Sequence, residues 1–77
     1  MNLAIETKAK VMIDYILLEH GLNTNLPNMD KIAKRIGWCR TAVRDVFIYL
    51  NAKGFADYTH GKRTKLIKDP YQTEEHY

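Results

Sequence analysis

Apolar residues recur at helical spacing in the first quarter of the chain. Those that share one helical face lie three or four residues apart, and they are Ile5, Ala9, Met12, Ile13, Ile16 and Leu17. Gly21, just beyond them, is a typical residue to end a helix. The pattern therefore predicts a helix over residues 3–19. Val11, Tyr15 and Leu18 widen its apolar stripe. The wider stripe has two interpretations: the helix packs against a second partner such as a dimer mate, or Tyr15 and Leu18 simply lie at the edge of the stripe.

Two shorter helices are predicted after a loop rich in Asn, Gly and Pro at residues 21–28. The first begins after Asn28, a favourable N-cap residue, and ends at Gly37. The second covers residues 40–53 and ends at Gly54. The apolar positions expected to pack the two helices together are Met29, Ile32, Ala33 and Ile36 on the first, and Val43, Val46, Phe47 and Leu50 on the second.

The rest of the chain is typical of a β-hairpin followed by a polar tail. Residues 55–59 and 64–68 have the composition of two short strands, and residues 60–63 form a basic turn between them. Residues 69–77 are acidic and are expected to be a flexible tail. The predicted fold class is mainly α with a small β-hairpin. It is a winged helix-turn-helix of three helices plus a two-stranded wing, in one domain over residues 1–68.

Composition narrows the function classes. The chain has 77 residues and one cysteine, Cys39, so an intramolecular disulfide is excluded. His20, His60 and His76 lie far apart in sequence, so no zinc site, other metal or cofactor is expected. The chain contains no serine and no glycine-rich phosphate loop, and we expect it not to be an enzyme. Neither a signal peptide nor a membrane-spanning run is evident, which predicts a cytoplasmic protein without membrane contacts.

Positive charge is concentrated in the middle of the chain. Residues 28–68 hold ten Lys or Arg residues against three acidic residues, whereas both flanking segments have an acidic excess. A polyanion such as double-stranded DNA is the natural partner of such a segment, although a solvated basic surface would give the same count.

The candidate DNA contacts fall into three groups. Arg40, Thr41 and Arg44 open the third helix on the side opposite its apolar face, where they are expected to reach base edges in the major groove. The helix before it offers side chains for backbone phosphates, namely Lys31, Lys34 and Arg35. The hairpin turn adds a basic wing tip for the minor groove or flanking phosphates, made of His60, Gly61, Lys62 and Arg63.

Residues 26–56 resemble the winged helix-turn-helix of the GntR family of bacterial transcriptional regulators. The matching positions are Leu26-Pro27, Ile32-Ala33, Ile36-Gly37, Arg40-Thr41, Val43-Arg44-Asp45, Leu50, Ala52 and Gly54-Phe55. The resemblance implies DNA contacts from Arg40, Thr41, Arg44 and the wing glycine Gly61. Regulators of this family also carry a C-terminal effector or oligomerisation domain, which this chain is expected to lack, so no small-molecule effector is expected.

Four positions depart from the family pattern. Asp30 stands where the family often has a phosphate-binding arginine, so that contact is expected to be absent or supplied by Lys31. Cys39 replaces a serine and predicts a weaker N-cap for the third helix. Trp38 replaces a small aliphatic residue and either joins the core or stacks beside the DNA backbone. Arg63 replaces a glycine of the wing, which adds charge and changes the turn.

Three functions remain open on the sequence. The first is a sequence-specific transcriptional regulator that binds an inverted repeat as a homodimer. The second is a DNA-binding accessory protein for replication, partition or excision in a phage or plasmid. The third, of another class, is a winged-helix adaptor that binds proteins.

Overall fold

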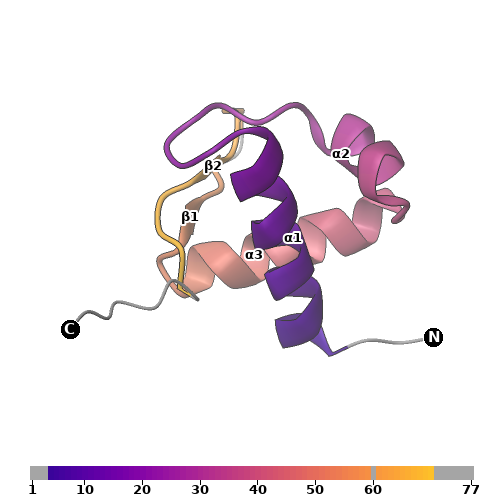
Figure 1. Cartoon of the computed structure of the whole chain (residues 1–77), viewed down its shortest axis with the longest axis horizontal. Coiled ribbons are helices and arrows are strands. Elements are labelled where there is room, and N and C mark those ends of the chain that lie inside the picture. The colour runs from indigo at the N-terminus through magenta and orange to yellow at the C-terminus, as the bar shows by residue number, and fades with distance from the viewer. Residues whose placement is uncertain (1–3, 60, 71–77) are drawn as a thin grey trace.

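The computed structural model describes residues 4–59 and 61–70, in the order of three helices and a hairpin (Figure 1). Helix α1 spans Ile5–Glu19, α2 spans Met29–Ile36 and α3 spans Arg40–Ala52. Strands β1, Ala56–Asp57, and β2, Lys65–Leu66, pair antiparallel. The predicted fold class of three helices with a two-stranded hairpin is therefore confirmed at this level, and the hairpin is called the wing below.

Helix α1 ends where the sequence predicts. The backbone N–H groups of His20 and Gly21 both donate to the carbonyl of Ile16, at 2.7 and 2.8 Å, and Gly21 has a φ of 93° that suits glycine. The observed helix begins at Ile5, and residue 3 of the predicted range lies outside the described residues. Of the three residues that widen the stripe, Tyr15 packs against the core, whereas Leu18 is 83% exposed and Val11 is exposed as well.

The two predicted ends of α2 are confirmed. The side chain of Asn28 accepts a hydrogen bond from the backbone N–H of Lys31 at 3.0 Å, which caps the helix. Gly37 adopts the left-handed conformation, with φ 77°, and the N–H of Trp38 returns to the carbonyl of Ala33. Trp38 is partly buried against the core, in agreement with the first of its two interpretations.

Helix α3 starts with a weak cap and ends close to the predicted residue. Cys39 occupies the N-cap position without a side-chain hydrogen bond, as the replacement of serine predicts. The last helical residue is Ala52, with Lys53 as the C-cap and Gly54 at φ 80°. This helix is the centre of the molecule, because α1 and α2 both pack on it.

The strands of the wing are shorter than predicted. They pair Ala56 with Leu66 and Asp57 with Lys65. The N–H of Tyr58, just beyond the paired residues, donates to the side-chain oxygen of Asn51, on α3, at 3.2 Å. This bond ties the wing to the helix.

The loop over residues 21–28 takes part in the sheet region, which the sequence did not predict. The N–H of Asn23 donates to the carbonyl of Leu66 at 2.8 Å, and the N–H of Leu26 donates to the carbonyl of Thr64 at 2.9 Å. The loop thus runs antiparallel along the second edge of β2 and covers backbone groups that would otherwise be exposed.

One core joins all of these elements. The helices contribute Ala9, Met12, Ile13, Ile16, Ile32, Ala33, Val43, Val46, Phe47 and Leu50, and the loop and wing contribute Leu26, Ala56 and Leu66. Ile36, which was predicted to be buried, packs only partly against this core. Over the described ranges, no helix is both long enough and apolar enough to cross a membrane.

Candidate nucleic-acid interface

The exposed face of α3 carries the residues that the sequence singled out. Thr41 and Arg44 are exposed, whereas Val43, Val46 and Phe47 are buried on the opposite face. Arg40, the first residue of the helix, is exposed too. Figure 1 shows α2 at the N-terminal end of α3 and the wing near its C-terminal end, so the two elements flank the helix at its two ends.

Ile48 belongs to the same face and was missed by the sequence analysis. It is 43% exposed although it is a large apolar residue. It follows Arg44 by four positions and Thr41 by seven, so helical phase places the three in one row. The same helical phase can be read from the sequence. An exposed apolar side chain on such a face suits the methyl group of thymine.

Arg40 is held by an acidic residue of α2. Its Nε lies 3.6 Å from Oδ1 of Asp30, and the side chains are 64% and 68% exposed. The family pattern predicts only that Asp30 removes a phosphate contact. The structure adds a second property, because Asp30 is the ion-pair partner of a residue predicted to read bases.

Arg35 is engaged by α1. Its Nε donates to Oε1 of Glu19 at 3.0 Å, and its Nη2 donates to the second carboxylate oxygen, Oε2. The hydrogen bonds from Arg35 lower the pKa of Glu19, and the same bonds raise the pKa of Arg35. Arg35 therefore links α1 to α2, while Lys31 and Lys34, the other predicted phosphate contacts, are exposed on α2.

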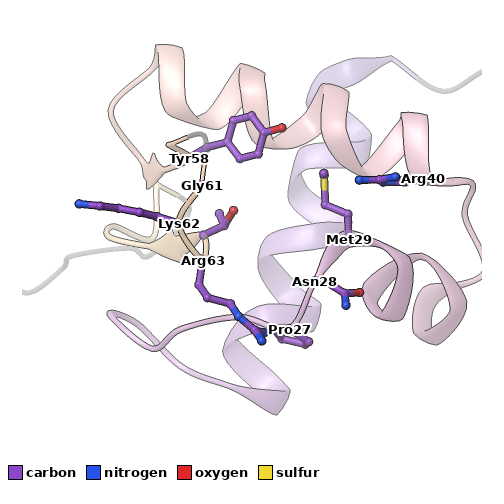
Figure 2. Close-up of a pocket in the computed structure, with 9 residues that line it drawn as sticks. Pro27, Asn28, Met29, Arg40, Tyr58, Gly61, Lys62 and Arg63 are labelled. Atoms are coloured by element: carbon purple, nitrogen blue, oxygen red, sulfur yellow. The ribbon is translucent and has the colours of Figure 1, made fainter.

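A groove lies between the wing and the starts of α2 and α3 (Figure 2). Its volume is about 290 Å³, and it is lined by Pro27, Asn28, Met29, Arg40, Tyr58, Gly61, Lys62, Arg63 and Thr64. Tyr58 contributes an aromatic wall that packs on Phe47, with ring centroids 5.8 Å apart. The groove thus brings Arg40 and three of the predicted wing-tip residues to one depression.

At the wing tip, the side chains of Arg63 and Lys62 point in different directions. Nη1 of Arg63 donates to the carbonyl of Leu26 at 3.1 Å, and Figure 2 shows this side chain turned toward Pro27, with Lys62 extending away from the groove. Arg63 thereby fastens the wing to the loop before α2, a role that the sequence did not indicate. Gly61 has a φ of 84°, and the N–H of Lys62 donates to the carbonyl of Thr59 to form the turn. His60, the remaining predicted wing-tip contact, lies outside the described residues, as do residues 71–77 of the predicted tail.

The described part of the chain contains no group of three His, Cys, Asp or Glu side chains placed to hold a metal ion. Cys39 is exposed at the start of α3. The exposed side of α3 offers basic, hydroxyl and apolar groups, which are kinds of group that can contact phosphates and bases.

No protein-family model and no curated protein matches this chain. The resemblance to the GntR family therefore remains a prediction from the residues quoted above.

Proposed function

We propose that this protein binds double-stranded DNA sequence-specifically and acts as a small transcriptional regulator with a GntR-like winged helix-turn-helix. The observation that carries the proposal is the exposed side of α3, which carries Arg40, Thr41 and Arg44. A helix is about 10–12 Å across with its side chains, close to the roughly 12 Å width of the major groove of B-DNA.

The side chains on α3 suit base recognition. The guanidinium of Arg44 can donate two parallel hydrogen bonds to O6 and N7 of guanine, and Thr41 can bond a base edge or contact a thymine methyl. These residues lie on the exposed side of a helix whose other side is fixed in the core. Fixed placement matters because base readout requires side chains held in register with the groove.

Lys31 and Lys34 on α2 supply phosphate contacts beside the major groove, and the wing tip at residues 60–63 supplies contacts to the minor groove or its phosphates. Arg35 contributes less, because its guanidinium is already paired with Glu19. The proposal includes a homodimer on an inverted repeat, with half-sites about one helical turn, roughly 34–36 Å, apart.

Selection of bound sequences from a random duplex pool, followed by titration of the selected duplex, tests this function. We expect an inverted-repeat consensus and a log affinity that falls steeply with log salt, since several phosphates are neutralised. Arg44→Ala is expected to cost about 1–3 kcal/mol on the selected duplex and much less on random duplex. Lys8→Ala, which removes the same charge from α1, is the control and should change neither value.

Equal affinity for all duplexes at every salt concentration would reject sequence-specific binding. Equal loss of affinity on all duplexes by Arg44→Ala would reassign that residue to a phosphate contact. A neighbouring gene for an integrase, an initiator or a partition ATPase would favour the accessory protein of a phage or plasmid over a regulator.

A protein-binding adaptor is the second candidate function. The observation that favours it is exposed apolar surface at the end of α1, where Leu18 is 83% exposed and Leu22 is exposed nearby in sequence. The absence of duplex binding at low salt, together with loss of a protein partner on Leu18→Asp, would favour the adaptor.

A further inference from the structure

Asp30 and Arg40 form a side-chain pair between two helix starts. Asp30 lies in the first turn of α2, and Arg40 is the first residue of α3. Their closest atoms are Oδ1 of Asp30 and Nε of Arg40, 3.6 Å apart. We propose that Asp30 is a specificity-determining residue that holds Arg40 for recognition of one guanine, an inference that rests on the DNA-binding function proposed above.

The pair suits base recognition because Asp30 lies beside Nε of Arg40 and not beside its terminal nitrogens. A guanidinium has five N–H donors, of which Nε supplies one. With Asp30 beside Nε, the four donors on Nη1 and Nη2 remain for a ligand. Two of them match O6 and N7 of guanine in a bidentate pair. The carboxylate therefore fixes one side of the guanidinium and leaves its terminal edge for the base.

In the free protein, an acid in the first turn of α2 gains only a modest interaction with the positive end of the helix dipole. Both side chains are largely exposed, and exposed ion pairs contribute little to stability. The cap of α2 is supplied by Asn28 and not by Asp30. An acid in the interface also weakens the general attraction to phosphates. In a DNA complex, however, exclusion of water strengthens the pair and restricts the rotamers of Arg40. Asp30 thus lowers non-specific affinity and increases discrimination.

The test uses the full chain and the duplex selected as described above. Dissociation constants are measured on that duplex, on versions with each guanine of a half-site replaced in turn, and on random duplex. Asp30→Ala is expected to reduce discrimination at one guanine position at least threefold, with random-duplex affinity unchanged or tighter. Arg40→Lys, which keeps the charge but not the bidentate fork, should lose discrimination at the same position. Adding Asp30→Ala to Arg40→Lys should then cause no further loss.

Asp14→Ala is the matched control, because it removes the same charge from the exposed side of α1. It should leave discrimination unchanged. If Asp30→Ala lowers the urea midpoint, Asp30→Asn, which keeps the shape of the side chain, is measured in its place.

The outcomes separate the two proposals. Selection that yields no preferred sequence for the unmodified protein overturns sequence-specific binding, and this inference with it, before any variant is made. A preferred sequence that Asp30→Ala binds with unchanged discrimination overturns only the inference. Tighter binding to all duplexes by the same factor also overturns it, since Asp30 would then act only as a repulsive charge.

Discussion

Asn28 fixes the start of α2 with one side-chain hydrogen bond. Its Oδ1 accepts from the N–H of Lys31, which has no partner within the helix at that position. Because α2 has only eight residues, loss of one capping bond is significant for its stability. We expect Asn28→Ala to lower the free energy of unfolding by about 1 kcal/mol. Urea unfolding followed by circular dichroism measures this loss.

The control for this prediction is Asn25→Ala, an exposed asparagine of the same loop. It should leave the urea midpoint nearly unchanged. Equal losses for the two variants would show that the cap at residue 28 adds nothing beyond a general effect of asparagine in this loop.

Single residues that act locally were predictable from sequence, and those that act over long distances were not. Asn28 marks the start of α2 and Gly37 marks its end, through contacts within a few residues. Their positions in the sequence pattern are therefore enough to predict where the helix starts and ends. Arg35 pairs with Glu19 across 16 positions, and Arg63 bonds Leu26 across 37. Nothing in the spacing of these residues indicates the partner, because the packing of whole elements brings them together.

At the scale of elements, the Glu19–Arg35 pair joins the end of α1 to α2. Its hydrogen bonds lower the folded-state pKa of Glu19 below the ordinary value of 4.5. A carboxyl group with a lowered pKa stabilises the folded state above its unfolded pKa, and this contribution is lost as the pH falls through the folded-state pKa. We therefore expect Glu19→Gln to be less stable than the unmodified protein at pH 7, with the difference disappearing well below pH 4.5.

Urea unfolding of both proteins over a series of pH values measures this convergence. Glu6→Gln, in the first turn of α1, is the control for removal of an exposed carboxylate from the same helix. A Glu19→Gln deficit that stays constant down to the lowest pH would contradict the assignment, because the deficit would then not depend on ionised Glu19.

The helices were predicted more accurately than the wing. Helix boundaries follow from caps and apolar spacing, which are local, and all three agree with the structure to within two residues. The strands were predicted at five residues each and have two. Asn51 of α3 takes the N–H of Tyr58, and the loop before α2 occupies the other edge of β2, so the wing bonds to other elements as well as within itself. Both contacts are tertiary and leave no periodic pattern in the sequence.

In the candidate interface, too, local features were predictable from the sequence and tertiary contacts were not. Helical phase was enough to predict that Thr41 and Arg44 are exposed on α3, and the same phase would have identified Ile48. The groove beside them and the Asp30–Arg40 pair depend on how the wing and α2 meet α3. The surface residues were therefore predictable one helix at a time, whereas their mutual arrangement was not.

The wing belongs to the same core as the helices, which predicts that the molecule unfolds as one unit. Leu66 of β2 is fully buried with residues of α1 and α3. Leu66→Ala is expected to cost about 2–5 kcal/mol through lost burial and the resulting cavity. This is a large share of the roughly 5–15 kcal/mol typical of small proteins.

The fluorescence of Trp38 reports on unfolding far from Leu66 in the chain, since Trp38 is the one tryptophan and lies in the turn between α2 and α3. In a cooperative domain, Leu66→Ala should shift the urea transition of Trp38 fluorescence and that of far-ultraviolet circular dichroism to the same lower midpoint. Ile67→Ala, at the exposed neighbouring position, should shift neither by a comparable amount. If both transitions stay at the midpoint of the unmodified protein, the wing unfolds separately from the helices, which give most of the circular dichroism signal. Helix α3 would then keep its packing on α1 and α2 when the wing is lost.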